Sequence, residues 1–351
     1  MRRPIWFQQV PESKAGKNRL HVDLYPTCSD NTLPLKRRIE IVETRTVKFG
    51  VHLPIMDFGD GRFAIEHLVE YVETATSLGF DAVSANDHMV FGLPWLDGPS
   101  ALTAVVSCSG DARLFTTVAN PVVRGPVALA KVLAGLDVMS GGRVWAGLGP
   151  GSSDRDYANV GLPFDERWPR FDEAVKAMRA LLRGESFAGH FYSIDGPLEP
   201  LPIQRDGLPL WVGSWGSDAG LRRAAQLGDG WLASAYNITP AQFALSWNRL
   251  HELLEQLGRN PGDFGNGLAT MWFHIDDSRA EDVLDKRLAP VLHRPVEQLR
   301  ERLAFGSAEA VVEKLVPFRD AGVQLMFLWP VADEIEQLHR FRDEVLVKMD
   351  A

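Results

Sequence analysis

The stretch PLWVGSWGSDAGLRRAAQLGDGW, residues 209–231, contains the unit from which the whole chain is built. Its apolar run at 210–212 has the length of a buried strand and stops at Gly213. The loop that follows consists of Gly213, Ser214, Trp215, Gly216 and Ser217. A helical segment then runs to Gly228, where the next apolar run begins. This order of strand, loop, helix and strand predicts a βαβ unit within a parallel sheet.

The same alternation extends from Val47 to the C-terminus. Short apolar runs predict eight strands, at 47–53, 82–85, 114–119, 144–148, 210–213, 231–233, 268–275 and 324–328. Helical spacing of apolar residues predicts helices between them, and Thr239 to Gln242 has the pattern of a capping box. Eight units favour a closed (β/α)8 TIM barrel over an open doubly wound sheet. In a barrel, we expect the chemistry in the loops after the strands.

Two stretches depart from the alternation. Residues 184–208 are rich in Gly and Pro and have no helical period, so we interpret them as an insertion that covers an active-site mouth. Residues 1–46 are polar and interrupted by prolines. We interpret them as an irregular N-terminal extension, which leaves 47–351 for the barrel domain.

The composition excludes several classes of partner. The 351 residues are 45% hydrophobic and 24% charged, with a net charge of −9, which argues against nucleic acid and acidic membranes as partners. No apolar stretch reaches the ~18 residues of a membrane span. Two cysteines and nine scattered histidines form neither a disulfide framework nor a metal-ligand pattern. We therefore expect a cytoplasmic protein without a metal site.

The loops after the second and third predicted strands carry candidate site residues. Asp87-His88 follows the second strand, where a histidine is well placed to move a proton and Asp87 to orient it. The alternative is a capping or core histidine. Ala119-Asn120-Pro121 follows the third strand, with Arg124 nearby. Asn120 offers hydrogen bonds to a ring amide and Arg124 offers a charge to an anion, whereas Asn-Pro also marks a simple turn.

The next two loops are rich in glycine. GLGPGSS at 147–153 comes near the dinucleotide fingerprint, but Ser152 occupies the position of the third glycine. Gly149 and Gly151 still allow a flat ligand to approach the backbone closely. The loop at 213–217 is either a plain turn or a phosphate site, because the N–H groups at the start of a helix attract anions. Asp218 would repel a phosphate if its side chain turned inward.

Three motifs together resemble the bacterial-luciferase-like superfamily of flavin-dependent oxidoreductases. They are GFDAVSANDHMVFG at 79–92, PVALAKVLAGLDVMSGGRVWAGLGPGSS at 126–153, and the opening stretch with its GDGW ending. The resemblance covers about 47–345 and implies a TIM barrel that binds reduced FMN or the deazaflavin coenzyme F420. It implies a phosphate on Ser214 and Ser217, a ring near His88, Asn120 and Gly149, and a non-prolyl cis peptide near 118–120.

The resemblance leaves three functions open. The first, which is our main expectation, is a monooxygenase that uses reduced FMN and O2 on a small organic substrate, with a separate flavin reductase as partner. The second is an F420-dependent enzyme that moves a hydride to or from a carbonyl, alcohol or imine. The third is a catalytically silent flavin-binding partner. Thr270-Met271-Trp272 stands where the alkanesulfonate-type members carry Arg-x-His, which argues against a sulfonate substrate. By analogy with the family, we expect a homodimer.

The chain also carries two weaker resemblances. IWFQQVPESKAGKNRLHVDL at 5–24 resembles a fragment of a glyoxalase-like domain and is too short to form that module. A fusion remnant or a misassigned start explains it equally well. GLGPGSS alone would fit a Rossmann-type dehydrogenase, which requires an open sheet.

Overall fold

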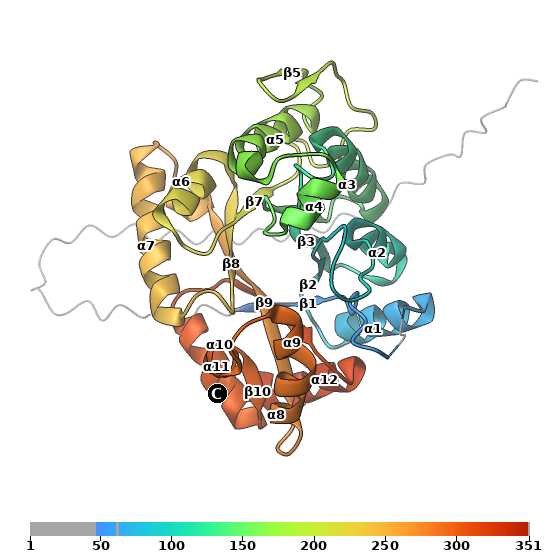
Figure 1. Ribbon diagram of the computed structural model, residues 1–351, viewed down its shortest axis with the longest axis vertical. Coiled ribbons are helices and arrows are strands. Elements are labelled where there is room, and N and C mark those ends of the chain that lie inside the picture. The colour runs from blue at the N-terminus through green and yellow to red at the C-terminus, as the bar shows by residue number, and fades with distance from the viewer. Residues whose placement is uncertain (1–46, 61–62, 350–351) are drawn as a thin grey trace, which may run out of the picture. The chain divides into compact units, whose positions relative to one another are not determined.

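The computed structural model describes residues 47–60 and 63–349. Its centre is a closed barrel of eight parallel strands (Figure 1), in which the last strand pairs with the first. The strands are β1 (Lys48–His52), β2 (Ala82–Ala85), β3 (Arg113–Ala119), β4 (Val144–Leu148), β7 (Leu210–Gly213), β8 (Gly230–Ser234), β9 (Gly265–Ile275) and β11 (Leu325–Pro330). The closed barrel confirms the predicted fold and removes both the open sheet and the Rossmann-type dehydrogenase.

Helices surround the barrel on its outside (Figure 1). The longer ones are α1 (Ile65–Ser77), α3 (Pro126–Ser140), α5 (Arg167–Leu181), α6 (Asp218–Leu227), α7 (Pro240–Gln256) and α11 (Ala308–Asp320). The shorter ones are α2 (Gly98–Ala104), α4 (Asp154–Asn159), α8 (Ala280–Val283), α9 (Ala289–Leu292), α10 (Val296–Arg302), α12 (Glu334–Arg340) and α13 (Val347–Met349). A short strand, β10 (Ala304–Gly306), pairs in parallel with the last three residues of β9. Single helical turns at 106–108, 164–166, 261–263, 284–288 and 341–346 complete the elements.

Local sequence signals account for most element boundaries. The strands β2, β4 and β7 begin and end at the predicted residues. The capping box of α7 is present, because the Thr239 hydroxyl accepts the N–H of Gln242 while the Gln242 side chain accepts the N–H of Thr239. The strand β9 begins three residues earlier than predicted, because glycines at 265 and 267 concealed its start. The predicted N-terminal extension, with its glyoxalase-like fragment, lies outside the described residues.

The segment 184–208 does not cover the site, and this prediction was wrong. It forms a small antiparallel hairpin, β5 (Phe187–Ala188) and β6 (Ser193–Ile194), outside α5 (Figure 1). Glu173 on α5 accepts the N–H groups of residues 190, 191 and 192 at 2.7–3.0 Å. Asp137 on α3 accepts those of 203 and 204. These carboxylates tie the segment to α5 and to the last turn of α3, and it lines none of the cavity described below.

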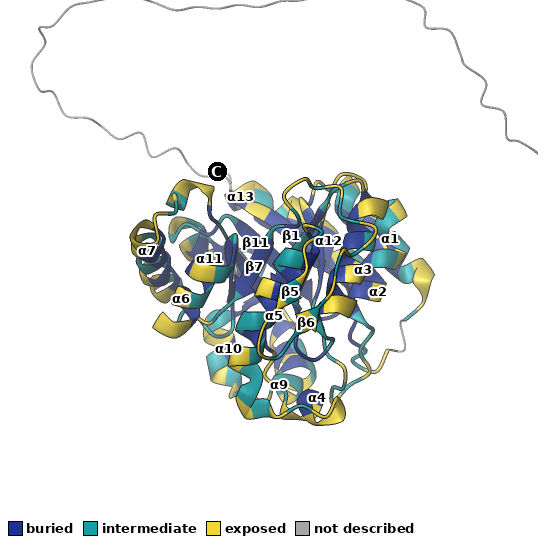
Figure 2. Cartoon of the chain, turned by 90° about the horizontal axis from the view of Figure 1, so that it is seen from above, coloured by how far each residue is buried: buried dark blue, intermediate teal, exposed yellow. Residues whose placement is uncertain are grey.

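Aromatic side chains fill the barrel and support the site from below. Buried residues concentrate in the strands and on the inner sides of the helices (Figure 2). Trp211 crosses the amino end of the barrel, where Gly230 leaves it room, since a Cβ at Gly230 would lie 2.3 Å from its ring. Nearer the carboxyl end, Trp329 stacks between His52 and Trp272 at centroid distances of 3.4 and 3.6 Å. The site therefore rests on a rigid core.

Candidate active site

A cavity of about 470 Å³ opens at the carboxyl ends of the strands. Residues from the loops after β2, β3, β4, β7 and β8 line it, together with Ala269 and Thr270 of β9. Thr270 has a positive φ of 59° at an irregularity in the pairing of β9 with β11, an uncommon conformation for a β-branched residue. This end of a TIM barrel is where chemistry is found.

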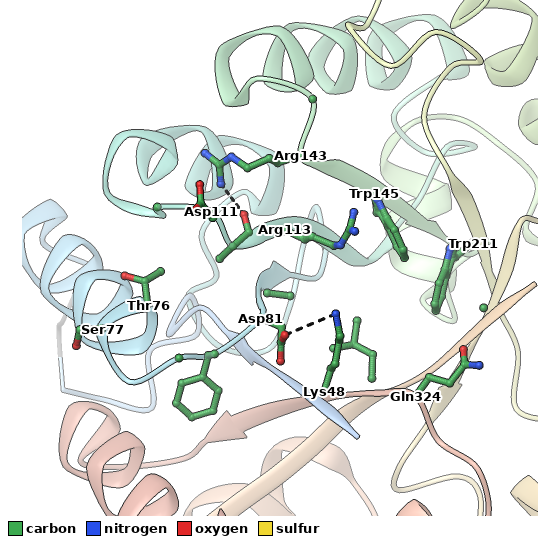
Figure 3. Close-up of a pocket in the computed structure, with 18 of the residues that line it drawn as sticks. Lys48, Thr76, Ser77, Asp81, Asp111, Arg113, Arg143, Trp145, Trp211 and Gln324 are labelled. Atoms are coloured by element: carbon green, nitrogen blue, oxygen red, sulfur yellow. Dashed lines mark hydrogen bonds and ion pairs between the residues drawn. The ribbon is translucent and has the colours of Figure 1, made fainter. Parts of the chain in front are cut away.

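A larger concavity of about 980 Å³ lies at the opposite, amino end of the barrel (Figure 3). Several of its charged side chains have partners within the protein. Lys48 pairs with Asp81 at 3.9 Å, Arg113 lies over the Trp145 ring, and Arg143 donates to backbone oxygens of 112 and 140. Because the amino end of a TIM barrel serves stability, we place the active site in the smaller cavity.

Asp87 lines the cavity, but its carboxylate forms an ion pair with an arginine. Nε and Nη2 of Arg124 donate to the two oxygens of Asp87 at 2.6 Å each, and Arg124 also binds Asp97. Burial opposes the charge of Arg124, yet its hydrogen bonds to both carboxylates outweigh this and raise its pKa. The anion that Arg124 meets is therefore part of the protein. Asp87 also accepts the N–H of Asn120 at 3.3 Å, so it joins the β2 and β3 loops.

His88 lines the cavity and is held by a residue that sequence analysis missed. Its Nδ1 lies 3.2 Å from Oδ2 of Asp156, which comes from α4 in the loop after β4. Phe91 and Trp95 contact the imidazole, both with ring centroids 4.9 Å away. Among the described residues, Nε2 of His88 has no hydrogen-bond partner. The predicted orienting role of Asp87 is wrong, because Asp156 contacts the ring.

Asn120 braces two loops. Its Nδ2 donates to the carbonyl of Pro150 at 2.8 Å, and its Oδ1 accepts the N–H groups of Val122 and Val123 at 3.0 and 3.1 Å. The Asn120 side chain also interacts with the Tyr157 hydroxyl, and its contact with a flavin ring stays a prediction. The predicted non-prolyl cis peptide is present in β3, between Thr117 and Val118.

The loop after β7 forms a cradle of anion donors. Ser217 caps α6 by accepting the N–H of Gly220 at 3.2 Å, and the Ser214 hydroxyl packs against the same glycine. The N–H groups of residues 217, 218 and 219 have no acceptor among the described residues. Hydroxyls and free N–H groups at the start of a helix are the donors that a phosphate requires.

Charges around the cradle suit an anion. The Asp218 carboxylate is turned outward, where it binds Arg222 at 2.7 Å and Arg249 at 3.2 Å. Its hydrogen bonds to these arginines lower its pKa, so it stays charged but does not face the cavity. Arg167, at the start of α5, lines the same cavity and was not predicted. It is the one arginine or lysine among the described lining residues, and its guanidinium lies 5.7 Å from the centroid of the Trp168 ring. Trp168 and Trp215, which also line the cavity, are 37% and 57% exposed.

Two residues that line the cavity each carry a buried polar atom with no hydrogen-bond partner among the described residues. They are Asn86, with Oδ1, directly after β2, and Thr117, with Oγ1, within the neighbouring β3. A buried polar group without a hydrogen bond is costly, so we expect these oxygens to gain their partners when a ligand fills the cavity. The pyrimidine edge of a flavin or deazaflavin carries both kinds of group. The residues present therefore fit such a ring, with its phosphate at the start of α6.

Most predicted site residues meet in this one cavity. Those that line it are Asp87, His88, Asn120, Gly149, Gly151, Gly213, Ser214, Trp215 and Ser217. Ala119 and Gly216 lie beside it without lining it. Besides Asp156 and Arg167, the residues that sequence analysis missed include Phe164, Tyr236 and Thr270. Asp154 and Asp156 open a short helix after GPGSS, the only local signal for that carboxylate.

The family of the chain follows from a sequence comparison. The profile of the luciferase-like monooxygenase family matches residues 47–291, which is more than half of the chain. The chain belongs to this family. The luciferase-like chain is thus an oxidoreductase, as expected. Within the described residues there is no group of His, Cys, Asp or Glu suited to a metal ion, and no helix there is long and apolar enough to span a membrane.

Curated relatives of the luciferase-like chain include two enzymes named for coenzyme F420. The F420-dependent hydroxymycolic acid dehydrogenase of Mycobacterium tuberculosis is 28% identical over 316 residues, with 82% of this chain and 86% of the relative covered. The F420-dependent glucose-6-phosphate dehydrogenase of Amycolatopsis mediterranei is 28% identical over 331 residues, with 83% and 96% covered. Among solved structures, the monooxygenase RslO1 from Streptomyces bottropensis shares the fold with a TM-score of 0.74 at 21% identity, covering 87% of this chain and all of the other.

Proposed function

We propose that the protein is an F420-dependent oxidoreductase that moves a hydride between the deazaflavin and an alcohol or carbonyl substrate. The observation that carries the proposal is His88, whose Nε2 has no hydrogen-bond partner among the described residues, in a cavity that also holds an anion cradle. The F420-dependent relatives support this function over the FMN-dependent monooxygenase that the motifs alone put first. The second candidate function is a monooxygenase that uses O2 and reduced FMN, with the reduced FMN supplied by a separate reductase. The family's name and the shared fold of RslO1 favour it.

The residues have separate tasks in this proposal. Ser214, Ser217 and the N–H groups at the start of α6 hold the cofactor phosphate. Asn86 and Thr117 bind the edge of its ring. When bound, the deazaflavin supplies the acceptor or donor of the hydride. In the direction of alcohol oxidation, Nε2 of His88 takes the hydroxyl proton as the C–O bond becomes C=O, and in the reverse direction it returns that proton.

The surroundings of His88 favour an uncharged, apolar substrate. Phe91 and Trp95 contact its ring, and Trp95 packs edge-on against Trp329. Arg167 is the one arginine or lysine among the described lining residues. A sugar phosphate would need a second cation beside His88. We therefore propose a secondary alcohol or ketone with apolar substituents, rather than a sugar phosphate, as substrate.

Turnover of the deazaflavin tests this function. The protein is mixed with oxidised F420 and a panel of secondary alcohols in the absence of O2. We expect it to reduce the cofactor, which is measured as a loss of deazaflavin absorbance. His88→Ala should lower kcat by at least about 100-fold, the usual contribution of a general acid or base. Glucose 6-phosphate should give no turnover. Oxygen-dependent turnover with reduced FMN alone would instead support the monooxygenase, and cofactor binding without any turnover would support a silent partner.

A further inference from the structure

We infer that Asp156 is the positioning residue of His88, and that it fixes the imidazole as the tautomer with its proton on Nδ1. The inference deepens the proposed function and rests on it for the role of the proton. Its structural part stands on geometry alone. Oδ2 of Asp156 lies 3.2 Å from Nδ1 of His88, across 68 residues of sequence. An ionised carboxylate only accepts hydrogen bonds, so Nδ1 is the donor in this pair.

Asp156 is itself held in one position. Its Oδ1 accepts the N–H of Val90 at 2.8 Å, two residues beyond the histidine that it contacts. Its own N–H is accepted by the Ser153 hydroxyl, which caps α4. Asp156 is 4% exposed, so water does not compete strongly for its oxygens. Both carboxylate oxygens are thus directed at the loop that carries His88.

The neighbouring carboxylate cannot do the same work. Asp87 precedes His88 in the chain, but both of its oxygens bind Arg124. Among the described residues, Asp156 is the only acid that forms a hydrogen bond or ion pair with the His88 ring. The aromatic contacts with Phe91 and Trp95 restrict how the ring turns but offer no acceptor to Nδ1.

The tautomer decides what His88 can do. With the proton on Nδ1, Nε2 presents a lone pair to the cavity and accepts a hydroxyl proton directly. As the substrate O–H bond breaks and the Nε2–H bond forms, the C–H electron pair leaves with the hydride to the deazaflavin. The imidazolium formed in this way lies beside the Asp156 carboxylate, which stabilises its positive charge. With the proton on Nε2 instead, the neutral ring would have no lone pair facing the substrate.

An NMR measurement on the wild-type protein tests the tautomer without any cofactor. Protein labelled with 15N-histidine is studied at about pH 8, where an ordinary imidazole is neutral. The His88 signals are assigned by their loss in His88→Gln. We expect the neutral form of the His88 ring to carry its proton on Nδ1. A proton found on Nε2 in the wild type would overturn the inference, whether or not the protein turns over F420.

The variant Asp156→Asn tests the positioning role. Its Oδ1 still accepts the N–H of Val90, while its amide donates to Nδ1 and forces the proton onto Nε2. We expect this switch in the NMR spectrum, a fall in kcat of at least about 100-fold, and unchanged F420 affinity. Asp154→Asn, in the same turn of α4 but exposed, is the matched control and should behave like the wild type. Wild-type kcat and tautomer in Asp156→Asn would refute the role.

Discussion

At the residue scale, His52 shows how strongly the core constrains its polar groups. It is 1% exposed, donates from Nδ1 to the carbonyl of Leu53 and accepts the N–H of Asn86 at Nε2. Burial lowers the pKa of His52 to about 3, against the smaller opposing effect of its backbone hydrogen bond. The neutral ring thus stacks on Trp329 and anchors Asn86, which lines the cavity.

This pKa makes the stability of the protein sensitive to acid. Between pH 6.5 and about 3, the unfolded chain binds a proton at His52 and the folded protein does not. Stability is therefore lost as the pH falls through this window, by up to about 1.4 kcal/mol per pH unit. His52→Gln removes this slope while an amide still donates and accepts. Denaturant unfolding at several pH values measures the free energy of unfolding of both proteins. If this free energy changed with pH in the same way for wild type and His52→Gln, the expectation would be contradicted.

At the element scale, the proposed function assigns the binding of the cofactor phosphate to the start of α6. Asp is as good a helix cap as Ser, so Ser217→Asp should keep α6 intact and add a negative charge inside the cradle. We expect the affinity for F420 to fall by at least about 10-fold, or about 1.4 kcal/mol. Asp218→Asn is the control, because this carboxylate faces outward toward Arg222 and Arg249. Circular dichroism checks the helix, and titration of F420 fluorescence measures the affinity.

If Ser217→Asp bound F420 as tightly as the wild type, the loop at 213–217 would be only a turn. The sequence of residues 209–231 alone is compatible with both a plain turn and a phosphate site. The outward side chain of Asp218 and the presence of Arg167 now favour the phosphate site, because one source of repulsion is absent and a cation has been added.

At the scale of the whole molecule, the outer face of α3 is unusually apolar. Its exposed side chains include Val127, Val132 and Met139, at 43%, 42% and 58%, with Lys131 as the charge among them. Contiguous apolar patches on a soluble protein mark contact surfaces. We propose that a second copy of the chain covers this face. Val132→Lys should then shift the mass in solution from dimer to monomer, whereas Val347→Lys, an exposed valine on α13, should not. A wild-type monomer by light scattering would contradict the proposal.

The sequence predicted the barrel well because each strand is a short apolar run ended by Gly, Pro or charge. It predicted the cradle and His88 because carboxyl-end loops follow directly from the strand assignment. It did not reveal Asp156 or Arg167, since their roles depend on how α4 and α5 fold over the mouth. The segment 184–208 was misinterpreted because Gly and Pro indicate a loop but not its direction, which Glu173 and Asp137 set.

The choice of cofactor is the central claim, and a direct binding measurement tests it. Wild-type protein is titrated anaerobically with F420 and with FMN, each in oxidised and reduced form, and Ser217→Asp is titrated in parallel. We predict that F420 binds at least about 10-fold more tightly than FMN and that the variant loses this affinity. Tight binding of reduced FMN with no binding of either form of F420 would contradict the account.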